Sequence, residues 1–299
     1  MRFGITPLQF DNTLGIVGVS GSPDFTRFDY AAIIREIYAQ GFSLIELTLD
    51  VRYVLPGGLS EQAVEALRMV KEELDLTFTA HLPLWAIEPA TPNQFIREAS
   101  VACTVDAIEL VKPLNPEVYV LHNTGALAAE FNRLELPNPF ARMVTEYFKM
   151  HSKQSVEEIL DQTGIPSEKL ALENVEFPFE ATWQIAEALN TGVCLDTGHL
   201  LAGFSGDIGI LEFIDRYFSR IREVHLHDGG QMASEGGTVR RYDHQALGTG
   251  MLPIEGFLSA LLERNYDGTI IFELSLQDAL ESLKVIRDRL TDFPIDSTH

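Results

Sequence analysis

Acidic and imidazole side chains recur at the ends of short apolar, β-branched segments of this 299-residue chain. The segments are TFTAH, EVYVLH, KLALE, GVCLD, IREVHLH and GTIIFE, and they bring in His81, His122, Glu173, Asp196, His225, His227 and Glu273. Apolar segments of this length are typical of buried parallel strands. When parallel strands close into a barrel, their carboxyl ends meet at one face. The pattern therefore predicts that these groups converge on a single pocket.

Such a pocket needs a cation. Two like charges about 4 Å apart repel by roughly 4 kcal/mol at an effective dielectric constant of about 20. A bound divalent metal offsets this repulsion. Imidazole and carboxylate ligands without thiolate suit zinc, manganese, iron(II) or cobalt. We predict a divalent-metal site that holds one to three ions, with zinc as the first choice and manganese or cobalt as alternatives.

Two further histidines follow strand ends within short motifs. In Asp196-Thr197-Gly198-His199 the acid closes a strand, and the histidine three residues later can turn back over the same opening. We expect Gly198 to permit a tight reversal there. His244 precedes a turn bracketed by glycines, in the sequence HQALGTG. Both histidines are therefore candidates for the same pocket.

The elements that must position these residues alternate along the whole chain, which is typical of α/β architecture. We predict one α/β domain over 1–299, a single (β/α)₈ TIM barrel with a long irregular loop at 228–253 on its active face. The expected strands are 3–6, 44–49, 77–81, 118–122, 170–174, 193–196, 221–227 and 269–274. The expected helices are 29–40, 60–74, 93–111, a long helix after a loop around Pro137 and Pro139 that ends near Thr163, 179–189, 208–218, 254–264 and 277–290.

Composition restricts the partners. The net charge is −22, so long nucleic acids are poor default partners and a small molecule is the expected substrate. The chain opens on a strand-like segment without a leader pattern, and no apolar run approaches the roughly 18 residues of a membrane span. Cys103 and Cys194, the only cysteines, have the pattern of small buried hydrophobic residues. We expect a cytoplasmic protein with no disulfides and no membrane association.

Seven motifs in order, AHLPL, VLHNTG, LENV, CLDTGHL, VHLHD, HQALGTG and FELS, make the chain resemble the xylose-isomerase-like barrel superfamily. That superfamily includes zinc-dependent apurinic endonucleases of the endonuclease IV type and many sugar isomerases and epimerases. The resemblance covers essentially the whole chain. It implies that a single metal of the isomerase type would be held by Glu173, Asp196, His225 and Glu273.

The endonuclease pattern implies a larger centre with three zinc ions. It adds histidines at the positions of His81, His122, His199 and His244. One position departs from that pattern: the family has a ligating aspartate two residues before the loop histidine, where this chain has Tyr242, and Asp243 is displaced by one. The third metal position is therefore the one that the resemblance supports least.

Within the superfamily, HLPL, ENVEFPFE, CLDTGHLL and HLHDG are most similar to the cobamide-remodelling phosphodiesterases. This resemblance implies hydrolysis of the phosphoribosyl linkage in the nucleotide loop of a corrinoid. Our leading hypothesis is a metal-dependent phosphodiesterase that acts on a small nucleotide-like or corrinoid substrate. Glu173, Glu273 and His199 are the expected catalytic residues.

Two other functions stay open. A sugar or sugar-phosphate isomerase or epimerase would use one metal, with Glu173 and Glu273 exchanging protons on opposite faces of the substrate. A barrel kept only as a ligand-binding module would need neither chemistry. The expected substrate contacts are His227, Trp85, Arg240 and Arg241. Each also has a structural interpretation: a residue behind the ligands for His227, a cap on the barrel rim for Trp85, and solvated loop cations for the arginines. Glu46, inside a strand, is expected to be a salt-bridge partner.

Overall fold

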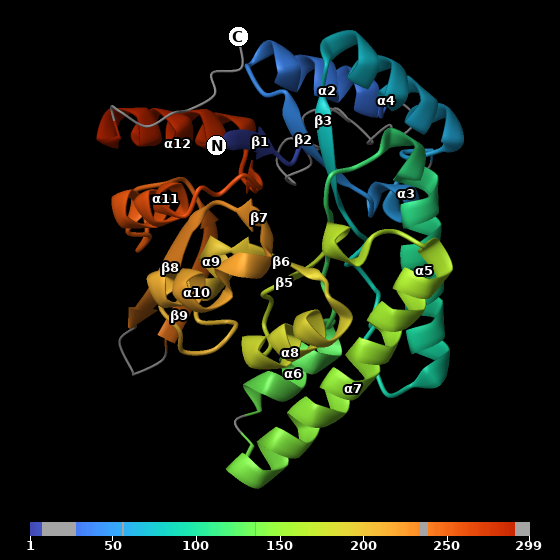
Figure 1. The fold of residues 1–299 in the computed structure, drawn as a ribbon, viewed down its shortest axis with the longest axis vertical. Helices are drawn as coiled ribbons and strands as arrows, with labels where there is room; N and C mark the ends of the chain where they lie inside the picture. The colour runs from blue at the N-terminus through green and yellow to red at the C-terminus, as the bar shows by residue number, and fades with distance from the viewer. Residues whose placement is uncertain (8–27, 56, 135, 234–238, 291–299) are drawn as a thin grey trace, which may run out of the picture.

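Eight parallel strands form a closed barrel in the computed structural model, which describes residues 1–7, 28–55, 57–134, 136–233 and 239–290 (Figure 1). In spatial order they are β1 (Arg2–Ile5), β10 (Thr269–Phe272), β7 (Ile221–His225), β6 (Gly192–Asp196), β5 (Leu170–Glu173), β4 (Tyr119–Leu121), β3 (Thr77–His81) and β2 (Leu44–Thr48). β1 closes the barrel because it pairs with β10 on one side and with β2 on the other. The predicted (β/α)₈ barrel is confirmed.

Helices surround the barrel and connect its strands. They are α2 (Tyr30–Ala39), α4 (Glu61–Leu74), α5 (Gln94–Val111), α7 (Asn138–Thr163), α8 (Phe179–Leu189), α10 (Ile210–Tyr217), α11 (Ile254–Glu263) and α12 (Leu276–Arg289). The side chains of Asp29 and Ser60 accept backbone N–H groups and so begin α2 and α4, and Gly164, with φ 63°, ends α7. Each helix buries an apolar stripe, such as Ile34 of α2 and Phe213 of α10, and each such side chain contributes about 1.5–3 kcal/mol.

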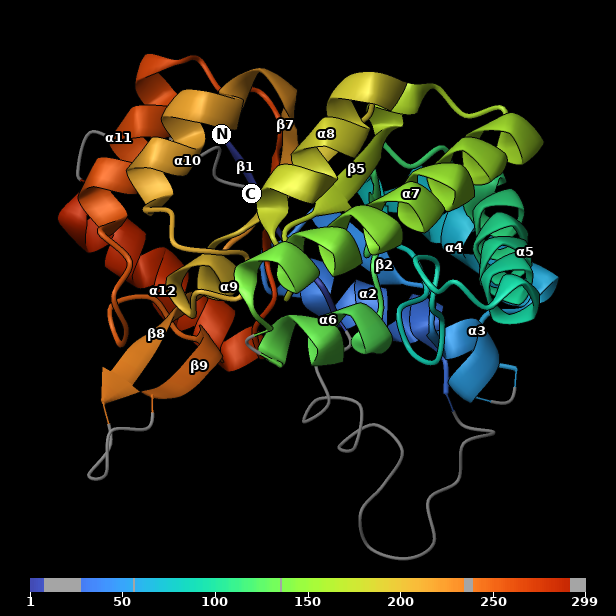
Figure 2. The same ribbon diagram turned by 90° about the horizontal axis from the view of Figure 1, so that it is seen from below.

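Shorter elements gather beyond the carboxyl ends of the strands (Figure 2). They are α3 (Val51–Val54), α6 (Ala126–Arg133), α9 (Thr197–Leu201), β8 (Asp228–Ala233) and β9 (Val239–Gln245). α9 begins at the end of β6 because the side chain of Asp196 accepts the backbone N–H of His199 at 2.6 Å. These elements form the rim of the face on which the predicted site residues lie.

The structure corrects three sequence-based boundaries. The stretch 228–253 is not an irregular loop, because β8 and β9 pair as an antiparallel hairpin. The seventh strand ends at His225 rather than at residue 227. Pro139, which we expected in a loop with Pro137, lies in the first turn of α7, where a helix needs no N–H donor, and α6 comes before that loop.

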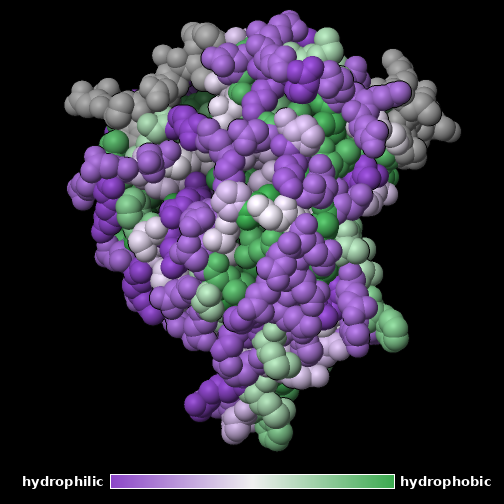
Figure 3. Space-filling model, turned by 45° about the vertical axis from the view of Figure 1, so that its right-hand side comes forward, coloured by the Kyte–Doolittle hydropathy of each residue, from purple (hydrophilic) through white to green (hydrophobic). Residues whose placement is uncertain are grey.

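The beginning of α7 projects from the barrel and carries exposed apolar side chains. Phe140 is 58% exposed and Met143 is 62% exposed, and Figure 3 shows apolar atoms gathered at the lower tip of the molecule, where α7 begins. A helix that crosses a bilayer must be long and apolar throughout, and the described helices include none of that kind.

Candidate metal centre

The predicted site residues lie at the carboxyl ends of six neighbouring strands. His81, Glu173, Asp196 and His225 are the last residues of β3, β5, β6 and β7, while His122 and Glu273 directly follow β4 and β10. Side chains on successive strand ends point into the same opening because the strands are parallel and in a closed ring. The barrel thus brings together residues that are separated by up to 192 positions in the sequence (273 − 81).

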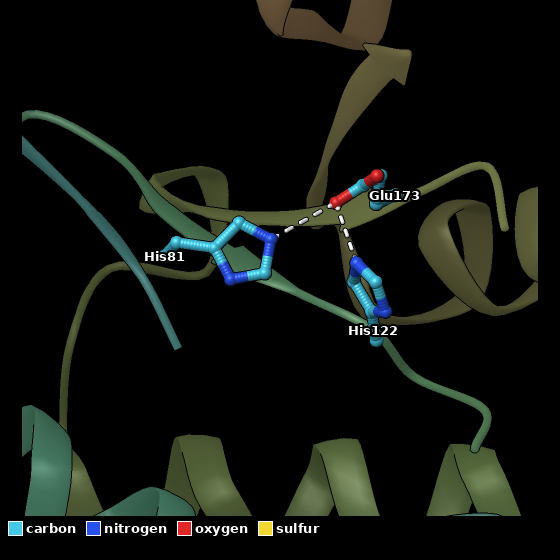
Figure 4. A group of neighbouring side chains, drawn as sticks. All are labelled: His81, His122 and Glu173. Atoms are coloured by element: carbon cyan, nitrogen blue, oxygen red, sulfur yellow. Dashed lines mark ion pairs between the residues drawn. The ribbon is translucent and has the colours of Figure 1, made fainter. Parts of the chain in front are cut away.

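Glu173 is the centre of this group, and four imidazoles surround its carboxylate. The nearest nitrogens of His81, His122, His199 and His225 lie 3.4, 2.9, 3.3 and 3.7 Å from its oxygens. Figure 4 shows His81 and His122 pointing toward the same oxygen, Oε2. Glu173 is buried, and neither of its oxygens has a partner with hydrogen-bond geometry. An ionised carboxylate in such surroundings requires a compensating cation.

The four residues of the isomerase-type set meet around Nδ1 of His225. This nitrogen lies 3.7 Å from Glu173 Oε2, 3.9 Å from Asp196 Oδ2 and 3.5 Å from Glu273 Oε1. Nδ1 is itself buried without a hydrogen-bond partner. One unpaired nitrogen facing three carboxylates is the arrangement that a divalent cation stabilises.

The donor set fits a borderline or hard divalent cation. Cys194 also approaches Glu173 and His225 from β6, with ligand atoms within 4.8 Å of one another. Burial raises the pKa of its thiol well above the ordinary value, so the sulfur is held as a neutral thiol. The remaining donors are imidazole nitrogens and carboxylate oxygens, which suit zinc, manganese or cobalt. Glu173, Asp196, His225 and Glu273 would hold the central ion.

Without metal, protons balance the buried carboxylates. Burial opposes the charge on both Glu173 and Glu273, but the neighbouring histidines hold both pKa values well below the usual range. Burial likewise opposes protonation of His81, yet Glu173 and Glu46 raise its pKa to about 10. The pKa of His199 rises to about 9, because Asp196 and Glu173 outweigh burial. A metal ion would therefore displace protons from these imidazoles as it binds.

The hairpin adds two more groups to the centre through a β-bulge. The pairing of β8 with β9 shifts between Asp228 and Gly230, and His244 in the bulge has a left-handed backbone with φ 51°. As a result, His244 reaches Glu273 at 3.4 Å, and Asp243 reaches His199 at 3.7 Å. Asp243 lies one position later in the sequence than the aspartate of the endonuclease pattern, and its carboxylate still reaches the centre. The sequence carries no signal of this bulge.

His227 lies behind the ligand residues. It is fully buried, its Nε2 lies 2.9 Å from Asp196 Oδ2, and its Nδ1 accepts the backbone N–H of His244 at 2.9 Å. Since Nδ1 accepts a hydrogen bond, Nε2 carries the proton that is donated to Asp196. Gly198 is required for this packing, because a Cβ there would lie 2.2 Å from the His227 ring. The glycine provides space rather than the tight reversal that we expected, since residue 198 lies within α9.

Two glutamates lie beneath His225, on the side away from the centre. Glu46 of β2 lies 3.2 Å from His225 Nε2, which confirms the predicted ion pair. Glu223 of β7 lies 3.8 Å from the same nitrogen and accepts a hydrogen bond from Thr269 at 2.5 Å. Both carboxylates are fully buried, and burial raises the pKa of Glu46 to about 7 although His225 opposes the shift. Sequence analysis did not foresee Glu223, which lies between Arg222 and Val224 in a strand that ends at His225.

The other three predicted substrate residues, unlike the buried His227, lie at the rim. Trp85, which is 47% exposed, borders a cleft together with His122 and His199. Arg241 is 3.8 Å from Glu176, and its guanidinium lies over the ring of Phe204. Arg240, the neighbouring residue on β9, is exposed. Of the two arginines, Arg241 is the one that packs against a wall of the cleft.

The fold and the ring of carboxylates and imidazoles at its strand ends define the chain as an α/β barrel with a candidate metal centre. A family model described as xylose isomerase-like TIM barrel matches residues 34–289. The chain therefore belongs to the xylose isomerase-like TIM barrel family.

The proteins to which the chain is similar include an uncharacterised protein and two structures with different names. The uncharacterised protein MJ1311 of Methanocaldococcus jannaschii is 25% identical over 248 residues, which cover 78% of this chain and 76% of that protein. A D-tagatose 3-epimerase-like protein has a similar structure, with a TM-score of 0.70 and 23% identity over 97% of both chains. Endonuclease IV from Thermus thermophilus matches with a TM-score of 0.63 and 22% identity, over 98% of this chain and 100% of that one. These structural similarities establish the fold alone.

Proposed function

We propose that the chain is a metal-dependent phosphodiesterase that acts on a small nucleotide-like substrate. The observation that supports this most is the position of Glu173, which belongs to two ligand sets. One set is Glu173 with Asp196, His225 and Glu273, and the other is Glu173 with His81 and His122. A carboxylate shared between two sets is suited to more than one ion, and paired ions serve in-line displacement at phosphorus.

The residues of the centre would have different roles in the reaction. Divalent cations bound there would acidify a water molecule and neutralise negative charge on the phosphate oxygens. Glu173 and Glu273 provide the compensating charge, while His199, beside Asp243, can hold or release a proton at the edge of the centre. The raised pKa values of the imidazoles in the metal-free protein agree with a site built for high positive charge.

The substrate that we favour is a corrinoid with a nucleotide loop, cleaved at its phosphoribosyl linkage. The motif resemblance supports this choice, and the net charge of −22 favours a small molecule over a long nucleic acid. The chain as a whole is acidic, but its candidate metal centre is rich in histidine. We infer that local cations, not the overall charge of the protein, attract the phosphate.

A second candidate is a sugar or sugar-phosphate epimerase. Glu173 and Glu273 lie 3.7 and 3.5 Å from His225 Nδ1, so two carboxylates are close to the same central position. Such a pair can remove and return a proton on opposite faces of one carbon atom. The similarity to the D-tagatose 3-epimerase-like protein and to D-psicose 3-epimerase from Clostridium cellulolyticum H10 supports this alternative.

Metal stoichiometry and activity together test the two proposals. We would load the protein with zinc, manganese or cobalt, count the ions per chain, and assay bis(4-nitrophenyl) phosphate, a cobamide, D-tagatose and D-fructose. The phosphodiesterase proposal expects more than one ion per chain and loss of diester cleavage in His122→Ala. His151→Ala, a histidine of α7 beside Tyr147, is the control that should keep full activity. One ion per chain with ketose epimerisation that persists in His122→Ala would refute the phosphodiesterase proposal.

A further inference from the structure

A cleft of about 460 Å³ opens beside the metal centre. His122 and His199 both line it, and the same two side chains approach Glu173 to 2.9 and 3.3 Å. An occupant of the cleft would therefore contact the imidazoles of the centre directly. Its volume lies in the range of roughly 300–1,000 Å³ that is typical of small-molecule and cofactor sites.

The walls of the cleft are mainly apolar. Among the described residues that border it, the side chains that contribute carbon surface are Leu84, Trp85, Ala126, Ala129, Val175 and Phe204. Beyond the two histidines, polar side chains enter the lining at Thr124 and Glu176. A sugar ring carries hydroxyl groups around its edge and needs a hydrogen-bond partner for each that is buried. A flat apolar group meets these walls at a lower desolvation cost.

The wall that carries Trp85 is held in place by a buried carboxylate. Asp50 accepts the backbone N–H groups of Leu84 and Trp85 at 3.1 and 2.9 Å. The next residue, Ala86, adopts a left-handed backbone with φ 61°, a conformation that L-residues rarely adopt and that surrounding contacts must impose. The backbone that carries the indole is thus held in place by contacts within the protein.

A second carboxylate joins this loop to the opposite wall. Glu88 accepts the backbone N–H of Leu127 at 2.9 Å, at the start of α6, which contributes Ala126 and Ala129 to the cleft. Gly125 allows this approach, because a Cβ there would lie 2.3 Å from the Glu88 carboxylate. The Trp85 loop and α6 therefore form one connected surface, and the cleft between them is preformed.

We propose that this cleft binds the planar heteroaromatic ring of the substrate, with Trp85 as the stacking surface and the phosphodiester directed toward His122 and His199. The inference rests on the proposed phosphodiesterase function and specifies its substrate class as a nucleoside or related riboside attached through phosphate. Stacking of a base on an aromatic side chain is sequence-tolerant, so the cleft selects for a flat ring rather than for one base.

Tryptophan fluorescence tests the ring site without any need for turnover. The chain has two tryptophans, and Trp183 packs against Tyr217 with ring centroids 4.7 Å apart. A Trp183→Phe variant keeps an aromatic ring there and leaves Trp85 as the single reporter. Adenosine and benzimidazole are expected to quench its emission in a saturable manner. Methyl β-D-ribofuranoside, which has the sugar without the aromatic ring, is the control and should leave the emission unchanged.

Calorimetry on Trp85 variants gives the second measurement. Trp85→Ala should weaken adenosine binding by about tenfold or more, and Trp85→Phe should restore most of the loss because it keeps a stacking surface. Equal adenosine affinity in all three proteins, or binding of neither aromatic probe, would overturn the inference. Saturable quenching in a protein that cleaves no diester would keep the ring site and refute only the phosphodiesterase. Cleavage of bis(4-nitrophenyl) phosphate without any quenching would keep the phosphodiesterase proposal and refute the ring site.

Discussion

The hydrogen bond between Glu46 and His225 leads to a specific expectation for metal affinity. Nε2 of His225 donates to Glu46 across 3.2 Å, which leaves Nδ1 free to face the three carboxylates of the centre. Replacing Glu46 with glutamine keeps the shape and an acceptor oxygen but removes the charge. The imidazole then becomes a weaker ligand, because a carboxylate partner raises the basicity of a metal-binding histidine and fixes its tautomer.

The size of the effect follows from the burial of the pair. Both residues are fully buried. A hydrogen bond to a charged partner contributes roughly 1.5–3 kcal/mol, against about 0.5–1.5 kcal/mol for a neutral one. The midpoints of the two ranges differ by about 1.25 kcal/mol, which corresponds to a loss of affinity for the central ion of roughly tenfold. The pKa of Glu46 in the metal-free protein is about 7, so the measurement is best made at pH 8, where the wild-type carboxyl is mainly ionised.

Competition with a chromophoric zinc chelator measures the change, and Glu223→Gln is the matched control. Glu223 lies only slightly farther from His225 Nε2, at 3.8 Å, but outside hydrogen-bond distance. If the hydrogen bond orients the ligand, Glu46→Gln loses about tenfold in zinc affinity and Glu223→Gln changes little. Equal losses in the two variants would mean that buried charge alone matters, and the positioning argument would be wrong. Thermal unfolding of the metal-free variants checks that both still fold.

Three further expectations concern pH, packing and the hairpin. In the metal-free protein the histidine pKa values lie above the ordinary 6.5, at about 9 for His199 and about 11 for His244, so their stabilising charge is complete below pH 6.5 and is lost as the pH rises through 9–11. The melting temperature of the metal-free protein should fall over that range, and a flat profile would contradict the assignment. Gly198→Ala should abolish stoichiometric zinc binding, because its Cβ meets His227, whereas Gly209→Ala, which has open space around it, should bind zinc normally. Asp228 accepts the backbone N–H groups of residues 229, 248 and 252. Asp228→Asn should therefore destabilise the loop at 246–252 by about 1–3 kcal/mol, and hydrogen exchange over these residues should become faster. Unchanged exchange would refute this role of Asp228.

Most strands of the barrel were predictable because they are short, mainly apolar segments that end in a polar residue or directly before one. KLALE and GVCLD have no polar interruption before Glu173 and Asp196, so burial on both faces is evident from the sequence. The convergence of these residues then follows from barrel closure. The caps at Asp29, Ser60 and Gly164 also matched the observed helix ends.

The hairpin was not predictable for the opposite reason. β9 has the sequence VRRYDHQ, in which exposed polar residues outnumber apolar ones, and its pairing with β8 depends on contacts with α9 rather than on a buried apolar face. Gly229 and Gly230 lie within β8, and further glycines lie between and after the two strands, so the segment has the composition of a loop. The contribution of Asp243 depends on the bulge and on the left-handed backbone of His244, and neither is encoded by residue type alone.

That bulge also affects how ligand positions are compared between related chains. An alignment that matches columns would record Tyr242 as a lost ligand, although the carboxylate of Asp243 reaches His199. A local change in strand register can shift a functional group along the chain while its place in space is kept. Surveys of metal stoichiometry across this family should therefore score the carboxylates that surround the loop histidine in three dimensions, and not a single alignment column.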